Sequence, residues 1–151
     1  MRKPVVGVIA STHQMEGRFA TQLTGERNLR AIADVCGALP MMFAGTPEVT
    51  DIAALLDVVD GVLLTGARAN VHPTRFGTEP HPAHEPYDEM RDAVALEVSR
   101  ACVEKGVPIF GVCRGFQEMA VAFGCALHPE IRDLPGRMNH RAPRLENGEI
   151  H

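Results

Sequence analysis

The chain has 151 residues, 45% of them hydrophobic and 23% charged, which is typical of a single globular domain with a buried core. Its net charge of −4 argues against a nucleic-acid partner, because phosphate binding requires clusters of lysine and arginine. No apolar run is long enough to span a membrane and the N-terminus lacks a signal-peptide pattern, so we expect a cytoplasmic protein without membrane contacts.

Short apolar runs alternate with helical patterns along the chain. Four of these runs predict buried strands: 5–9, 39–43, 62–64 and 107–112. Apolar spacing and end signals predict four helices: around 29–36, 52–59, 87–105 and 116–123. A polar loop, 67–86, precedes the third helix, and 125–127 is a candidate for another strand.

This alternation predicts one α/β domain over residues 1–151, with a mostly parallel sheet and helices on both faces. The chain shows no internal repeat and no linker that would divide it. Four positions with helical spacing predict the apolar face of the last helix: Phe116, Met119, Ala120 and Phe123.

The most informative stretch joins the last predicted strand to the last helix. Cys113 lies between Gly111 and Gly115, each two residues away, in the Gly-x-nucleophile-x-Gly pattern of a nucleophile elbow. A side chain at either glycine would collide with its neighbours in such a strained turn. The turn places the sulfur at a helix N-terminus, where free N–H groups and the helix dipole favour negative charge. Cys113 is therefore the predicted nucleophile, and a chance pattern around a buried structural cysteine is the alternative.

The other three cysteines show no such local sequence. Cys36, Cys102 and Cys125 lie far apart without a Cys-x-x-Cys pair, which favours reduced thiols over a disulfide framework or a metal site. Their positions on apolar faces or strand edges predict that they behave as small hydrophobic side chains.

Acyl transfer requires a nucleophile, donors for the oxyanion and a general base. Reactive groups in a parallel sheet gather beyond the carboxyl ends of its strands, where the loops 65–73 and 113–115 are expected to meet. The backbone N–H of Arg114 is one predicted oxyanion donor, and that of Gly66 is the candidate for the second. The alternative interpretation of Gly66 is a plain tight turn.

Two segments after the last strand, 111–119 and 122–128, resemble the nucleophile region of class I glutamine amidotransferase-like hydrolases, and in particular the γ-glutamyl-γ-aminobutyrate hydrolase (peptidase C26) branch. The segment 64–73 resembles the oxyanion loop of that branch, and Arg91-Asp92 and 4–8 match it as well. The resemblance covers essentially the whole chain. It implies a flavodoxin-like three-layer sandwich.

The resemblance also implies roles for individual residues. Cys113 matches the nucleophile that attacks the γ-glutamyl carbonyl and forms a thioester, while Gly66 and Arg114 match the oxyanion donors. Gln117 matches a glutamine beside the bound γ-glutamyl group, with a solvated residue of the first helical turn as the alternative. The implied substrate is a small γ-glutamyl compound of putrescine degradation. No cofactor or metal is expected, and a homodimer is left open.

The chain departs from the family pattern at the general base. The family uses a histidine followed two residues later by a glutamate, far downstream of the elbow. Here Glu149 and His151 stand in the opposite order in a polar tail, and His151 is not expected to be the base. The chain thus resembles the N-terminal part of a hydrolase, and we expect a domain that is incomplete at its C-terminus and lacks the family's last strands. We expect its thiol to react with electrophiles while γ-glutamyl turnover stays near background.

The sequence also leaves functions other than hydrolysis open. His72, His81 and His84 form a weak metal pattern and are interpreted as a solvated loop rim. A glutaminase subunit that passes ammonia to a synthase partner remains open. A cysteine-elbow sensor of oxidants or electrophiles would need a carboxylate beside the thiol, for which Glu118 and Glu16 are the candidates.

Overall fold

The computed structural model describes residues 2–131, 134–136 and 138. Strands and helices alternate along most of this part of the chain. In order they are β1 (Val5–Ile9), β2 (Ser11–Met15), β3 (Phe19–Leu23), α1 (Glu26–Arg30), the π-helical turn η1 (Ala31–Val35), β4 (Leu39–Phe43), α2 (Ile52–Val58), β5 (Gly61–Leu64), α3 (Glu89–Lys105), β6 (Ile109–Gly111) and α4 (Arg114–Ala122). The predicted strands and helices up to the elbow are confirmed, with shifts of a few residues at their ends.

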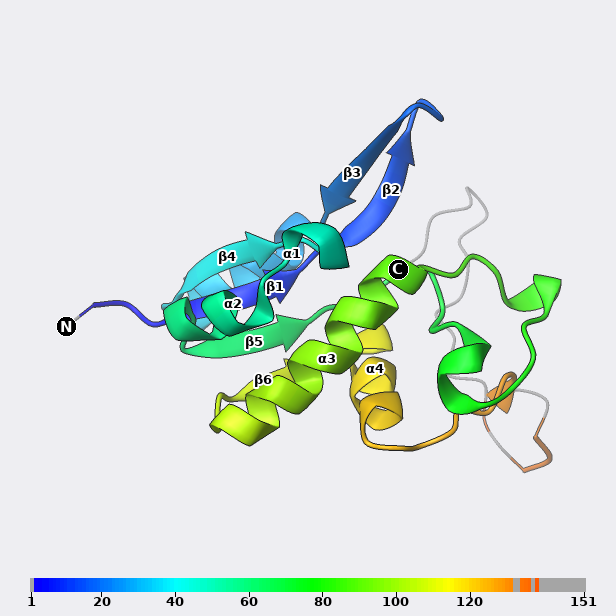
Figure 1. Cartoon of the computed structure of the whole chain (residues 1–151). Coiled ribbons are helices and arrows are strands. Elements are labelled where there is room, and N and C mark those ends of the chain that lie inside the picture. Colours follow the sequence, from blue (N-terminus) through cyan, green and yellow to red (C-terminus); the bar gives the residue numbers. More distant parts are fainter. Residues whose placement is uncertain (1, 132–133, 137, 139–151) are drawn as a thin grey trace.

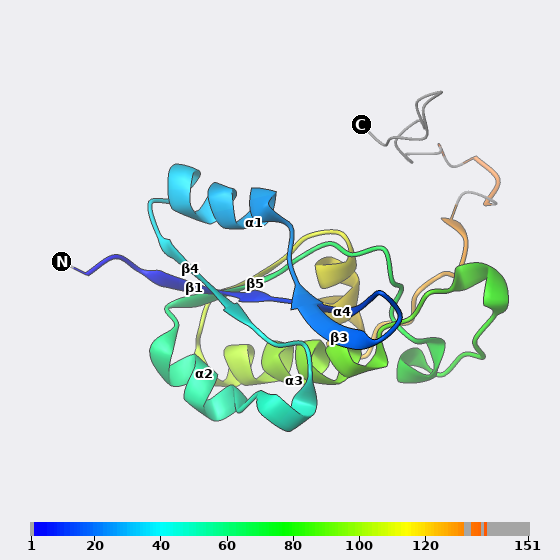
Figure 2. The same cartoon turned by 90° about the horizontal axis from the view of Figure 1, so that it is seen from above.

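Strands β4, β1, β5 and β6 form a parallel sheet in that order (Figure 1). Helix α1 lies on one face of this sheet, and α2 and α3 lie on the other (Figure 2). Neighbouring side chains of β1 point to opposite faces of the sheet: Val8 packs with Ile32 of η1 on one face, and Ile9 packs with Val94 of α3 on the other. The predicted α/β class, with helices on both faces of a mostly parallel sheet, is confirmed.

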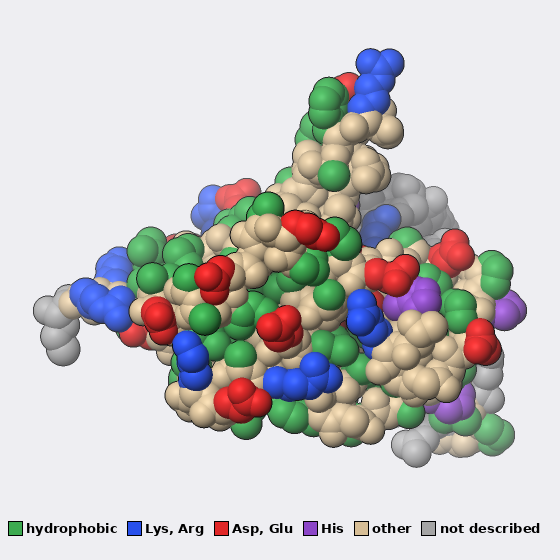
Figure 3. All heavy atoms as spheres, viewed as in Figure 1, with side chains coloured by type: hydrophobic (Ala, Val, Ile, Leu, Met, Phe, Trp, Pro, Cys, Tyr) green, Lys and Arg blue, Asp and Glu red, His purple; other side chains and the backbone are tan. Residues whose placement is uncertain are grey.

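A hairpin formed by β2 and β3 was not predicted. Its antiparallel strands pair Ser11 with Leu23 and Met15 with Phe19, and it projects from the body of the molecule as an arm (Figures 1 and 3). Met15 and Phe19 near its tip are 51% and 62% exposed. Because neither face of the arm is fully buried, its sequence lacks the apolar alternation by which a strand is recognised.

Two predictions for the end of the described chain are wrong. Residues 125–127 form no strand, since Cys125 N–H donates to the Ala120 carbonyl at 2.9 Å and so closes the end of α4. The predicted apolar face of α4 is largely exposed, with Phe116 66% and Phe123 52% accessible. The buried face of α4 instead includes Arg114 and Glu118, whose partners lie on α3.

Within the described part of the chain, every helix is too short or too polar to cross a bilayer.

Candidate active site

The elbow between β6 and α4 has the strained backbone that its glycines predict. Cys113 has φ 52° and ψ −107°, in a region that residues with a side chain rarely adopt. Its turn is held by backbone hydrogen bonds, from Gly115 N–H to the Val112 carbonyl at 2.9 Å and from Gln117 N–H to the Cys113 carbonyl at 3.2 Å. The Cys113 side chain is exposed, which contradicts the alternative of a buried structural cysteine.

Both flanking glycines lie where a side chain cannot fit. A Cβ atom on Gly111 would come within 2.6 Å of the carbonyl carbon of Gly115. A Cβ atom on Gly115 would overlap the carbonyl group of Leu64 at the end of β5. The strand and the helix therefore approach each other too closely for any residue but glycine at these two positions.

Gly66 lies directly beside the elbow. A Cβ atom built on it would stand 3.4 Å from the Cβ atom of Cys113, so the loop after β5 and the turn before α4 meet as expected. In the part of the chain that the structure describes, the backbone N–H groups of Gly66 and Arg114 donate to no acceptor. Two unpaired donors next to an exposed thiol are what an oxyanion site requires.

All four cysteines lie in the described part of the chain, and their settings differ. Cys113 precedes the first residue of α4, at the positive end of the helix dipole. Cys36 and Cys125 are exposed, contrary to the expectation that they pack as small hydrophobic residues, and both follow the C-terminal end of a helix. Cys102 is fully buried within α3, and this burial raises the pKa of its thiol to about 11.

These settings predict a clear order of alkylation by iodoacetamide. At about pH 6 we expect Cys113 to react first, because a helix N-terminus stabilises the reactive thiolate and a helix C-terminus does not. Cys102 should stay unlabelled in the folded chain until the pH approaches its pKa of about 11, since below that value the thiol keeps its proton. Peptide mapping of the labelled chain measures this order. Preferential labelling of Cys36 or Cys125 would contradict the elbow assignment.

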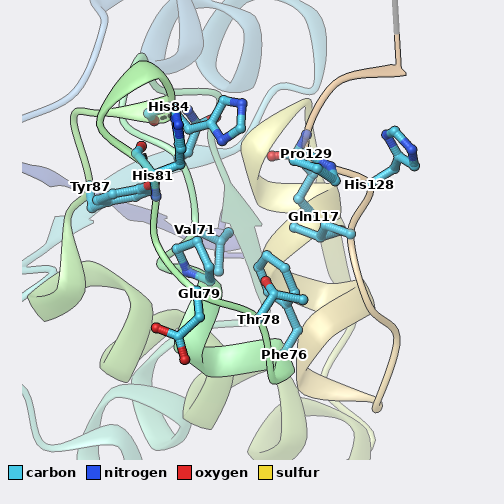
Figure 4. Close-up of a pocket in the computed structure, with 13 residues that line it drawn as sticks. Val71, Phe76, Thr78, Glu79, His81, His84, Tyr87, Gln117, His128 and Pro129 are labelled. Carbon is cyan, nitrogen blue, oxygen red and sulfur yellow. Dashed lines mark hydrogen bonds between the residues drawn. The ribbon is translucent and has the colours of Figure 1, made fainter. Parts of the chain in front are cut away.

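A cavity of about 360 Å³ opens beside the first turn of α4. Gln117 lines it from the helix, while His81, His84 and Tyr87 line it from the segment that follows β5 (Figure 4). The backbone hydrogen bond from Gln117 to Cys113 places the elbow one helical turn away from this cavity. Gln117 is thus half-buried at the cavity and is not a solvated residue of an open helix face.

His81 and His84 lie at the rim of this cavity, and the exposed position of His81 agrees with the predicted solvated loop rim. The rings of His81 and His84 lie 5.5 Å apart, centroid to centroid, and His81 Nδ1 accepts a hydrogen bond from Ala83 N–H at 3.1 Å. His72 lies apart from them, with its ring against Tyr87. Among the described residues, no group of three histidine, cysteine or acidic side chains is arranged to hold a metal ion.

The sensor hypothesis requires a carboxylate beside the Cys113 thiol, and Glu118 does not supply it. Its carboxylate is fully buried and accepts hydrogen bonds from Arg91 Nε at 2.8 Å and Nη2 at 2.9 Å. Burial raises the pKa of Glu118, and the charge of Arg91 opposes that rise. Burial likewise raises the pKa of Asp92, against the hydrogen bond from His72 N–H and the charge of Arg114. The sequence pointed to Arg91-Asp92 through the family resemblance but gave these residues no role.

Among the described residues, no histidine stands at the elbow as a general base. None of the histidines in the described part of the chain forms a hydrogen bond with Cys113. Glu149 and His151, which are close together in the sequence, lie outside the described residues.

A strained cysteine elbow at the carboxyl edge of a parallel sheet is the arrangement of nucleophile-elbow α/β proteins, and it is consistent with a glutamine amidotransferase-like fold. The sequence model of the peptidase C26 family matches residues 4–151, and the chain belongs to this family. The family resemblance noted in the sequence is thereby confirmed.

Several curated proteins are similar to the chain. The γ-glutamyl-γ-aminobutyrate hydrolase PuuD of Escherichia coli (strain K12) is 36% identical over 145 residues, which cover 93% of this chain and 54% of that protein. The γ-glutamyl-γ-aminobutyrate hydrolase of Shigella flexneri is 35% identical over the same coverage. The putative glutamine amidotransferase Rv2859c of Mycobacterium tuberculosis is 35% identical over 91 residues, 60% of this chain and 29% of that protein. The chain thus spans about half the length of the hydrolases it matches.

Proposed function

We propose that the protein represented by this chain hydrolyses a γ-glutamyl amide bond, with Cys113 as the nucleophile. The observation that carries the proposal is the exposed Cys113 thiol, held at positive φ at the start of α4. Beside it lie the backbone N–H groups of Gly66 and Arg114, which have no acceptor among the described residues. The family membership and the hydrolase names of the similar proteins support it.

The reaction proceeds through a thioester. The Cys113 sulfur attacks the γ-carbonyl carbon, a carbon–sulfur bond forms, and the carbonyl oxygen takes up negative charge. The N–H groups of Gly66 and Arg114 stabilise that oxygen, which is the step in which preorganised donors contribute most. The carbon–nitrogen bond then breaks and the leaving amine takes a proton. Water attacks the thioester and releases glutamate, and the sulfur is regenerated.

The cavity beside Gln117 is the proposed site of substrate recognition. Its volume of about 360 Å³ is in the range of small-molecule sites. A γ-glutamyl group carries an amine and a carboxylate, and the amide of Gln117 can donate to one and accept from the other. The similar proteins are named for γ-glutamyl-γ-aminobutyrate, so we propose γ-aminobutyrate as the leaving amine.

A general base from outside the described residues completes the mechanism. Protonation of the amine and activation of water both need a group that transfers protons near neutral pH, and the family pattern assigns this work to a histidine oriented by a glutamate. Added imidazole can perform the same proton transfers from solution.

This chemistry predicts the behaviour of the 151-residue chain with a γ-glutamyl anilide. We expect hydrolysis near background in plain buffer, a rise with imidazole concentration, and loss of that rise in Cys113→Ala. An α-glutamyl anilide, in which the other carboxyl carries the amide, is the matched control and should not be cleaved. Equal imidazole-dependent cleavage by Cys113→Ala would refute the nucleophile. Many turnovers without imidazole would show that these residues already contain the base.

A glutaminase is the second candidate, because the Mycobacterium tuberculosis relative is named a putative glutamine amidotransferase. It would use the same thioester and differ in the leaving group, which would be ammonia. Comparing glutamine with γ-glutamyl-γ-aminobutyrate as substrates, under the same imidazole conditions and without a partner protein, separates the two.

A further inference from the structure

Four charged side chains are buried beneath the elbow. Arg91 and Asp92 come from the first turn of α3, and Arg114 and Glu118 come from the first turns of α4. Each is at most 1% exposed. The two positive and two negative charges balance, so the cluster is neutral as a unit. The chemistry proposed for Cys113 does not use any of these four side chains.

Arg91 contacts the peptide group that carries one of the proposed oxyanion donors. Its Nη2 donates to the carbonyl oxygen of Thr65 at 2.5 Å. That oxygen and the N–H of Gly66 belong to the same planar peptide unit, so fixing the carbonyl also fixes the direction of the N–H. A cationic donor on the oxygen polarises the unit further, which makes the N–H a stronger donor to a developing negative charge.

Arg91 is itself held on its remaining sides. Glu118 accepts from its Nε and Nη2 at 2.8 and 2.9 Å, in a bidentate pair that fixes the plane of the guanidinium group. Ser11, at the start of β2, accepts from Nη1 at 2.7 Å. These contacts come from α4 and β2, and together with Thr65, which follows β5, they hold the Arg91 side chain in one orientation.

The same carboxylate also contacts the side chain of Arg114, the residue whose backbone N–H is the second proposed donor. Glu118 Oε1 lies 3.0 Å from Nε of Arg114, one turn earlier on α4. The Arg114 side chain is further tied to Asp92 Oδ1 at 2.5 Å. Glu118 therefore links the loop that bears Gly66 to the turn that bears Arg114.

We propose that Arg91 is a positioning residue for thioester formation. It orients the Thr65–Gly66 peptide so that the N–H of Gly66 points to the oxyanion formed at Cys113. Glu118 holds Arg91 in place. This inference rests on the function proposed above. A buried ion pair is often no more stabilising than apolar side chains of the same volume, so stability alone gives little reason for four buried charges at this position.

The test compares two reactions of the same thiol. Acylation by p-nitrophenyl acetate forms a carbon–sulfur bond and a transient oxyanion, breaks the ester carbon–oxygen bond and releases p-nitrophenolate, while the thiol proton goes to solvent. Alkylation by iodoacetamide forms a carbon–sulfur bond and releases iodide without an oxyanion. Both rates are measured in a chain carrying Cys36→Ser and Cys125→Ser, which removes the other exposed thiols. Neither reagent requires recognition of a γ-glutamyl group.

In this background, Arg91→Lys keeps the positive charge and removes the planar fork that reaches Thr65 and Glu118 together. We expect acylation of Cys113 to slow by at least about tenfold, which is less than the effect of losing an oxyanion donor outright. The rate of alkylation should stay within about twofold of the rate in the same background without the substitution. Arg100→Lys is the matched control, because Arg100 also ties α3 to α4, through the Ala122 carbonyl at 3.0 Å far from the elbow. It should change neither rate.

Equal slowing of both reactions by Arg91→Lys, or unchanged acylation, would overturn the positioning role. If Arg91→Lys does not fold, Glu118→Gln is tested in its place and should slow acylation while leaving alkylation unchanged. Unchanged acylation in Glu118→Gln would equally overturn the proposal. Failure of the proposed function is seen separately, because it would abolish imidazole-dependent cleavage of the γ-glutamyl anilide even where the acylation ratio behaves as expected.

Discussion

Gly115→Val is expected to destabilise the chain by more than about 4 kcal/mol, which is enough to leave a domain of ordinary stability largely unfolded. Any Cβ atom at this position overlaps the carbonyl group of Leu64, which is backbone at the end of β5 and cannot rotate away. Valine adds two further methyl groups at the same point. Relief would require α4 to move off the sheet, and with it the buried contacts of Glu118 with α3.

Chemical denaturation followed by circular dichroism measures this loss. Gly25→Val is the matched control, because Gly25 has an ordinary φ of −67° and its added Cβ atom would meet other atoms no closer than 3.5 Å. The control should change the free energy of unfolding by about 1 kcal/mol or less. A folded Gly115→Val chain with unchanged reactivity of Cys113 would show that the elbow is not a constrained turn.

Glu118→Leu is expected to cost about 3 to 5 kcal/mol, the range measured when one partner of a buried ion pair is removed. The substitution leaves Arg91 and Arg114 buried with Asp92 as the remaining acidic partner within the cluster. Leucine fills a similar volume, so the loss is electrostatic and is not caused by a cavity.

A double-mutant cycle of Glu118→Leu with Arg91→Met tests whether the loss of stability comes from the unpaired buried charge. If the unpaired charge causes the loss, the double variant should be more stable than the sum of the two single variants predicts. The exposed pair of Arg30 with Glu26 is the matched comparison, since Glu26→Ala should change stability by less than about 0.5 kcal/mol. Additive losses at Arg91 and Glu118 would contradict the coupling.

The sheet and the elbow could be predicted because their signals are local. Apolar runs of strand length and the spacing of Gly111 and Gly115 around Cys113 depend on steric rules that act within a few residues. The β2–β3 arm was missed because its strands bury little surface and its pattern is polar.

The buried charges could not be found in this way. Burial of Glu118 depends on Arg91, 27 residues earlier, and a pattern of hydrophobicity assigns two such residues to the surface. For the same reason the helical spacing assigns Phe116 to the apolar face of the last helix, although its side chain is 66% exposed in the structure. The position of Gly66 beside Cys113 could be expected, because both residues follow strands at the carboxyl edge of a parallel sheet. The strand order, in which β5 and β6 are direct neighbours, could not be read from local patterns.

The central claim is that Cys113 receives the γ-glutamyl group, and the diazoketone analogue of glutamine tests it most directly. This reagent keeps the amine and carboxylate of a glutamyl group and places an electrophilic carbon near the position of the γ-carbonyl. Mass spectrometry of the labelled peptides should find one adduct per chain, on Cys113, formed faster than on Cys36 or Cys125. Gln117→Ala should slow this labelling and leave alkylation by iodoacetamide unchanged. Labelling spread equally over the three exposed cysteines, or unaffected by Gln117→Ala, would contradict the proposed site.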